Sequence, residues 1–184
     1  MKVLTPKQAR SFLRACETNR FGLMFELALI SGMRPEEYLA IQWTDLDFQK
    51  CTVTIQRVIV WKRWIKGWCF SEPKTPGSKR TIPLPSHLMR KFQQHRKHQL
   101  EHRLKMGEEY QDEHNLVLTS EIGTPVSLRN LERRFYKHLL KTAGLPDIRL
   151  YDLRHSCATL LLPAGENPKV VSERLWTLNN SVDA

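Results

Sequence analysis

Two arginines and one histidine occupy positions in this 184-residue chain where solvent-facing charge is not expected. Arg34 lies between Gly32, which can end one helix, and Pro35, which can begin the next. Arg154 and His155 interrupt an otherwise apolar helical segment. A buried guanidinium needs a partner, so each arginine should either meet an acid of the protein or bind an anionic ligand. The chemistry that the two arginines could do together is the binding of an oxyanion.

Each of these residues also has a purely structural interpretation. Arg34 can form an ion pair with Glu36 or Glu37, and the segment Tyr151–His155 can be a satisfied hydrogen-bonded network. Lys74, at the start of a hairpin turn, either delivers an amine to a ligand or is a solvated turn lysine. The local sequence alone leaves both interpretations open.

The overall charge favours a polyanionic partner. Lys and Arg number 29 against 19 Asp and Glu, which gives a net charge of +10 and a pI near 9.7. Nucleic acid is the first candidate, an anionic membrane the second, and simple solubility the remaining explanation.

Cysteine use and hydropathy predict a cytoplasmic protein with reduced thiols. The four cysteines lack CxxC spacing, and the sequence contains no secretory signal and no apolar span of ~20 residues. A chain of this length can bury one sizeable core, and no repeat or interdomain linker interrupts it. We therefore expect a single domain over residues 1–184.

The charged positions must be held by a mainly helical fold. "LTPKQARSFLRAC" predicts a helix capped by Thr5, and "FGLMFELALISG" predicts a buried central helix that stops at Gly32. A helix from Pro35 should carry Tyr38, Leu39 and Trp43 inward. Further helices are predicted over Ser86–Lys105, from Ser127 to Gly144 with a core stripe of Leu128, Leu131, Phe135 and Leu139, through "LYDLRHSCATLLL", and from Asn167 onward.

Between Cys51 and Leu84 the pattern changes to strands. "CTVTIQRVIVW" is β-branched and partly alternating, Lys66-Gly67 predicts a turn, and "PKTPGSKRTIPL" predicts a strand, a tight turn and a strand. The expected fold is therefore mainly α with one small three-stranded antiparallel β-sheet, an α+β class.

Four segments, taken in order, resemble the motifs of a known family. They are "SGMRPEEYLAIQWTDLD", "EPKTPGSKRTIPLP", "GTPVSLRNLERRFYKHLLKTAGLP" and "YDLRHSCATLLL" with the following "AGENPKVVSERL". From about residue 4 to residue 175 the chain resembles the tyrosine recombinases, the phage-integrase family of site-specific DNA recombinases. The resemblance implies the family's catalytic-domain fold, here without the separate N-terminal core-binding domain.

The resemblance also implies a chemistry and a set of site residues. Members attack a DNA phosphodiester with a tyrosine, form a 3′-phosphotyrosyl link and rejoin the strand without a metal or other cofactor. By motif position, Arg34 and Arg154 bind the nonbridging phosphate oxygens. Lys74 corresponds to the lysine that protonates the leaving 5′-oxygen, and Glu37 to the acid that steadies the first arginine. His155 follows the second arginine, as in many members.

The chain departs from the family pattern at two places. Tyr151 stands where members usually have a histidine, three residues before the second arginine, and Thr177 stands where they have a second histidine or a tryptophan. The nucleophilic tyrosine should follow, yet no tyrosine comes after Tyr151 in these 184 residues. We therefore expect residues 176–184 to be a divergent tail of a chain truncated before its nucleophile, and Tyr151 to have a structural or proton-handling role.

Three functions stay open at this point. The chain is a recombinase catalytic domain that is inactive alone, a non-catalytic DNA-binding module, or a remnant of a decayed integrase. A tyrosine supplied by another protomer would make the catalytic domain active. A type IB topoisomerase is the nearest enzymatic alternative. In each case the expected partner is double-stranded DNA, with other recombinase protomers as further candidates, and neither a membrane nor a small-molecule substrate.

Three histidines near one helical face, His95, His98 and His102, could suggest a metal site. The arginines and lysines between them would repel a cation, so we expect a solvated or phosphate-facing basic helix instead. Among the strands, packing is the favoured role of Trp61, Trp64 and Trp68, and Arg80 and Thr81 are candidates to touch backbone phosphates.

Overall fold

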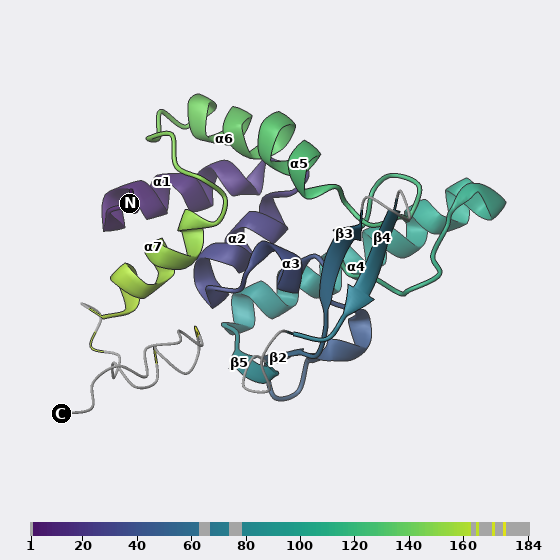
Figure 1. Cartoon of the computed structure of the whole chain (residues 1–184). Coiled ribbons are helices and arrows are strands. Elements are labelled where there is room, and N and C mark those ends of the chain that lie inside the picture. Colours follow the sequence, from purple (N-terminus) through teal and green to yellow (C-terminus); the bar gives the residue numbers. More distant parts are fainter. Residues whose placement is uncertain are drawn as a thin grey trace.

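A central apolar helix organises the fold. In the computed structural model, which describes residues 2–62, 67–73 and 79–162 together with Gly165, Val171 and Leu175, α2 (Gly22–Ser31) lies in the middle of the helices. It contacts α1 (Pro6–Glu17), α3 (Pro35–Tyr38), α4 (Ser86–Met106) and α7 (Asp152–Leu161) (Figure 1). Eight of its ten residues are buried, because a helix that is apolar on all sides must be enclosed on all sides.

The start of α1 and the end of α2 follow the predicted signals. Thr5 caps α1 through a capping box with Gln8, in which each side chain accepts a hydrogen bond from the other residue's backbone N–H. The buried face of α1 includes Phe12, whose burial stabilises the fold by about 1.5–3 kcal/mol. α2 ends at Gly32, which has φ 65°, a left-handed conformation that glycine adopts without a Cβ clash.

A π-helical segment widens the buried face of the helical stretch before α7. α5 (Leu128–Asn130), the π-helical segment η5 (Leu131–Tyr136) and α6 (Lys137–Thr142) follow one another and lie over α1 in Figure 1. The extra residue in the π turn brings Tyr136 into the core, fully buried, while the neighbouring Phe135 also packs against the core, with its ring centroid 4.5 Å from that of Phe21. The predicted stripe of Leu128, Leu131, Phe135 and Leu139 is therefore confirmed, and Tyr136 widens it.

The mainly helical class with small antiparallel strands is confirmed, but the strands form two sheets rather than one. β1 (Leu46–Asp47), β2 (Thr52–Ile55) and β5 (Arg80–Pro83) pair in the order β1-β2-β5, and β3 (Val58–Lys62) pairs separately with β4 (Gly67–Ser71).

The split occurs inside the strand predicted from "CTVTIQRVIVW". Its middle, Gln56 and Arg57, leaves the ladder, and Arg57 turns to form an ion pair with Asp45, whose side chain is only 2% exposed. A buried carboxylate requires such a partner, and this demand outweighs the β propensity of the segment.

The histidine face of α4 contacts the segment 116–121, so the prediction of a solvated or phosphate-facing face is wrong for the partly buried His95, whereas His102 stays exposed. The Nε2–H of His95 donates to the carbonyl of Val117 at 2.7 Å, and that of His102 donates to the carbonyl of Glu121 at 2.7 Å. Between them Gln99 donates to the carbonyl of Leu116. These side chains satisfy the backbone of an extended segment that has few partners of its own.

Other local predictions also changed. α3 stops at Tyr38, although Tyr38, Leu39 and Trp43 are all buried as predicted. Trp68 packs against Phe70, but Trp61 is 65% exposed, so packing is the wrong role for Trp61. Trp64, the candidate tail 176–184 and most of the helix predicted from Asn167 lie outside the described residues.

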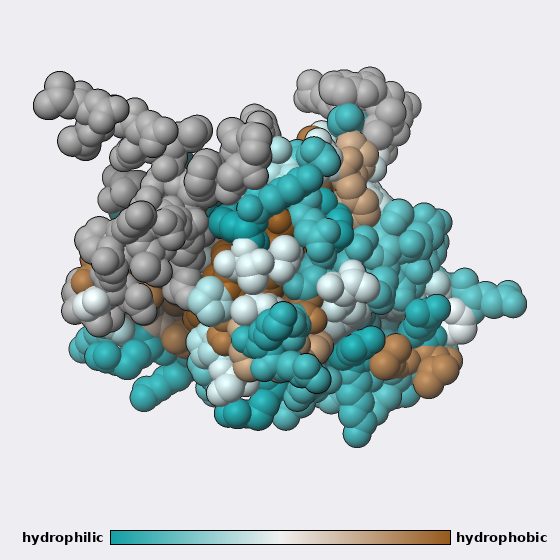
Figure 2. Space-filling view, turned by 90° about the horizontal axis from the view of Figure 1, so that it is seen from below, coloured by the Kyte–Doolittle hydropathy of each residue, from teal (hydrophilic) through white to brown (hydrophobic). Residues whose placement is uncertain are grey.

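The surface is dominated by polar groups on the face drawn in Figure 2, where hydrophobic residues show only between hydrophilic ones near the middle and at a few places along the edge. None of the helices in the described part of the chain has the length and apolarity needed to cross a membrane.

Candidate functional site

Arg34 is fixed by a buried acid one helical turn away. It is the N-cap residue of α3, and Glu37 Oε2 accepts a hydrogen bond from its backbone N–H at 2.8 Å. Glu37 Oε1 accepts a second bond from the guanidinium Nη1 at 3.0 Å. Because the side chain of Glu37 is 1% exposed and that of Arg34 is 29% exposed, the acid is an internal anchor and the arginine reaches toward the surface.

A second guanidinium binds the same carboxylate. Arg80, at the start of β5, donates from Nη1 to Oε1 and from Nη2 to Oε2 of Glu37, both at 3.0 Å. Because both of its terminal nitrogens bind Glu37, it is not placed to touch a DNA backbone, contrary to the prediction. The other residue of that pair, Thr81, is exposed and shares a hydrogen bond with Thr54 on β2.

The pKa values of this group follow from the same contacts. Burial alone would raise the pKa of Glu37, but its hydrogen bonds and charge interactions with Arg80, followed by those with Arg34, hold the pKa below its ordinary value. Burial opposes the charge of Arg34, while Glu37 and a side-chain hydrogen bond with Tyr151 raise its pKa. Both groups are therefore firmly ionised at neutral pH.

Arg154 is the least compensated cation in the cluster. It is buried in α7 at 4% exposure, and its Nη1 donates to the carbonyl of Gly32. Its Nη2 is buried and has no hydrogen-bond partner within the described residues. Burial, followed by repulsion from Arg34, lowers the pKa of Arg154 to about 10. A buried, incompletely paired guanidinium of this kind is suited to an anionic ligand.

The start of α7 is held so that Arg154 points inward. Asp152 is buried and receives Nε, Nη2 and the backbone N–H of Arg149, and the hydrogen bonds from Arg149 lower the pKa of Asp152. One turn later Ser156 Oγ accepts the backbone N–H of Leu4 at 3.0 Å. The motif "YDLRHS" therefore combines residues that anchor the helix with the arginine that the helix presents.

Tyr151 and His155 lie on the open side of the same helix. Their rings are 5.8 Å apart, Tyr151 is 39% exposed, and its hydroxyl accepts a hydrogen bond from Arg34. Tyr151, which stands where the family usually has a histidine, thus contacts Arg34.

The structure brings five of the predicted site residues into one cluster: Arg34, Glu37, Tyr151, Arg154 and His155. Lys74 and Thr177 lie outside the described residues. With Arg80 included, three guanidinium charges and one carboxylate charge leave a net +2. This charge suits an oxyanion, in particular one that gains negative charge as it reacts.

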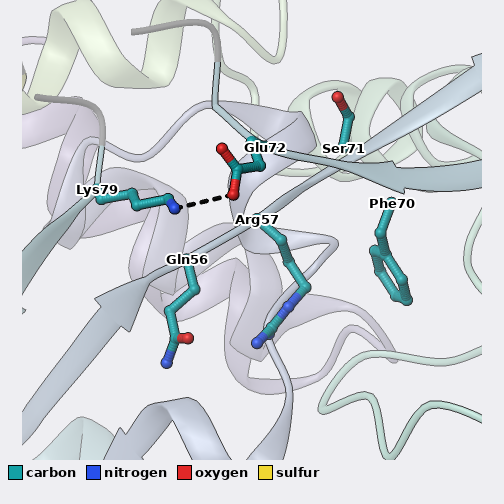
Figure 3. Close-up of a pocket in the computed structure, with 6 residues that line it drawn as sticks. All are labelled: Gln56, Arg57, Phe70, Ser71, Glu72 and Lys79. Atoms are coloured by element: carbon teal, nitrogen blue, oxygen red, sulfur yellow. Dashed lines mark hydrogen bonds and ion pairs between the residues drawn. The ribbon is translucent and has the colours of Figure 1, made fainter. Parts of the chain in front are cut away.

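Another pocket carries basic residues but is already neutralised. It has a volume of about 410 Å³ and is lined by Gln56, Arg57, Phe70, Ser71, Glu72 and Lys79 (Figure 3). Lys79 forms an ion pair with Glu72 at 3.1 Å, and Arg57 pairs with Asp45. An anion would have to compete with these acids, so the Arg34–Arg154 cluster is the better anion site.

The sequence did not predict the role of Arg80. Its signal was the alternation of "RTIP", in which Arg80 shares the inward face of the strand with the fully buried Ile82. A charged residue in phase with a core residue indicates a buried partner.

Fold and site together define a mainly helical α+β domain with a positively charged cluster suited to an oxyanion, and comparison with known proteins identifies the family. The profile described as the phage integrase family matches residues 2–176. The chain therefore belongs to this family, the tyrosine recombinases, and the resemblance drawn from the motifs is confirmed.

Individual relatives agree with this assignment. A tyrosine recombinase XerC-like protein of Caldanaerobacter subterraneus subsp. tengcongensis is 33% identical over 100% of this chain and 49% of its own length. An integrase of Streptomyces ambofaciens is 32% identical over 89% of this chain and 43% of its own length. The chain thus spans about half the length of these curated relatives.

Solved structures share the fold at lower identity. The integrase of the Tn1549 transposon, in complex with transposon right end DNA, has a TM-score of 0.81 and 23% identity over 97% of this chain and 58% of that chain. The XerA recombinase has a TM-score of 0.75 and 16% identity over 97% of this chain and 57% of that chain.

Proposed function

We propose that this chain is the part of a site-specific DNA recombinase that binds the scissile phosphate of double-stranded DNA. The observation that carries the proposal is Arg154, a buried and incompletely paired guanidinium beside Arg34 in a cluster of net charge +2. The basic composition and the structural neighbours that are recombinases bound to DNA support the same partner.

In this proposal Arg34 and Arg154 hold the two nonbridging oxygens of the phosphate. Their planar, permanently charged groups stabilise the second negative charge that develops when a nucleophile adds to phosphorus. Tyr151 and His155 hydrogen-bond at the open side of the site, and Lys74 acts as the general acid that protonates the leaving 5′-oxygen.

The test is salt-dependent binding to a duplex oligonucleotide, measured by fluorescence anisotropy. If both arginines contact phosphates, Arg34→Gln and Arg154→Gln each lower the affinity and reduce the slope of log K against log salt by about 1. The matched control is Arg103→Gln, which removes an exposed arginine paired with Asp112 at the far end of α4. Site variants that retain the wild-type slope and affinity would contradict the proposal.

A further inference from the structure

The carboxylate of Glu37 is shared by two guanidinium groups that come from different parts of the chain. Each of its oxygens accepts two hydrogen bonds: Oε1 from Arg34 Nη1 and Arg80 Nη1, and Oε2 from Arg34 N and Arg80 Nη2. All four distances lie between 2.8 and 3.0 Å. The acid therefore joins the N-terminus of α3 to the first residue of β5.

Arg80 is placed to act on this acid and not on a ligand. Its side chain is 8% exposed, against 29% for Arg34, and its fork makes the planar two-bond contact with both oxygens that only a guanidinium provides. It also contributes to the positive field at Arg154, although less than Arg34 does.

We propose that Arg80 is a positioning residue of the phosphate site: through the carboxylate of Glu37, it fixes the backbone and guanidinium of Arg34. The inference rests on the proposed function only in that phosphate is taken as the ligand of Arg34. Without Arg80, the whole charge of Glu37 acts on Arg34 and draws its guanidinium toward the protein interior. The net charge of the cluster falls at the same time from +2 to +1.

A charge-preserving variant separates positioning from direct contact. Lysine at position 80 keeps the charge but cannot make the two-bond fork with Glu37. We expect Arg80→Lys and Arg80→Met both to weaken binding to a fluorescein-labelled duplex by about 5–20-fold, and both to reduce the salt slope by about 1. Circular dichroism of each variant checks that it is folded.

A double-mutant cycle with Arg34→Gln completes the test. If Arg80 acts through Arg34, Arg80→Lys has no further effect on affinity or slope once Arg34 is replaced. The matched control is Arg57→Lys, which changes another arginine bound to a buried acid, Asp45, and should leave the slope unchanged.

Each other outcome has a definite meaning. Wild-type binding by Arg80→Lys, or losses from Arg80→Met that add fully to those of Arg34→Gln, would overturn the positioning role. A loss of affinity with an unchanged slope of log K against log salt would mean that Arg80 only stabilises the fold, and it would overturn the positioning role as well. If Arg34→Gln itself has no effect on affinity or slope, the proposed function fails. The same binding titration measures this outcome.

Discussion

At the level of single residues, Arg154 carries a cost in the ligand-free chain. Its pKa of about 10, well below the ordinary value of an arginine, corresponds to about 3 kcal/mol of unfavourable free energy for the charged form in the folded chain. The group stays protonated at neutral pH in both the folded and the unfolded state, so this cost is constant there. As the pH rises through about 10, the folded state releases this proton before the unfolded state does, so the free energy of unfolding rises with pH there.

We therefore expect Arg154→Met to stabilise the ligand-free chain. Removing an incompletely paired buried charge while keeping most of the volume should raise the free energy of unfolding by about 1–3 kcal/mol. Thermal unfolding should show an increase in Tm of about 2–4 °C for each kcal/mol.

The contrasting variant is Arg57→Met, which should lower Tm because it leaves Asp45 buried without its cation. If Arg154→Met instead destabilises the chain as much as Arg57→Met does, the charge of Arg154 is fully compensated without a ligand.

At the level of elements, the ends of helices were predictable and the routes of strands were not. Thr5, Gly32 and Pro35 act through short-range backbone geometry, so their effects are visible in a few neighbouring residues. The break in the first predicted strand depends on Asp45, twelve residues from Arg57, and the meeting of Glu37 with Arg80 spans 43 residues. Such pairings depend on the tertiary structure, and the local periodicity of the sequence does not predict them.

The attachment of α4 to the segment 116–121 predicts a pH-dependent stability. Burial lowers the pKa of His95 from its ordinary value of 6.5, so the unfolded chain takes up a proton first as the pH falls. The contribution of neutral His95 to the free energy of unfolding is fully present above pH 6.5. It is lost as the pH falls from there through the folded-state pKa.

Urea unfolding at a series of pH values between about 7 and 5 measures this effect. His95→Gln should lose stability less steeply over this range than the wild type, whereas the exposed His102 provides the control variant His102→Gln. Parallel curves for wild type and His95→Gln would show that His95 does not titrate differently in the two states.

At the level of the whole molecule, the family and its fold were predictable because the motifs recur in order along most of the chain. The cluster itself joins residues 34, 37 and 80 to residues 151–155, and only the folded chain brings them together.

The burial of the four tyrosines bears on whether one of them could attack a phosphate. Tyr38, Tyr110 and Tyr136 are buried, and Tyr151, the exposed one, bonds to Arg34 from the helix that carries Arg154.

We therefore expect the 184-residue chain to bind a nicked suicide DNA substrate without forming a covalent link. Denaturing electrophoresis should show no protein–DNA adduct under conditions in which anisotropy shows binding. Addition of an intact recombinase protomer supplies the control for a nucleophile provided by another chain. An adduct formed by the 184 residues alone, and lost in Tyr151→Phe, would assign attack to Tyr151 and contradict this expectation.

The bond from Arg154 to the carbonyl of Gly32 has a consequence for the folding of the chain. One partner, Gly32, terminates α2 and the other lies 122 residues later in α7, so a polypeptide that still lacks α7 has no complete anion site. If the ligand is DNA, as proposed, its binding is thermodynamically linked to completion of the native topology, because a ligand that binds only the folded chain shifts the folding equilibrium toward it by mass action.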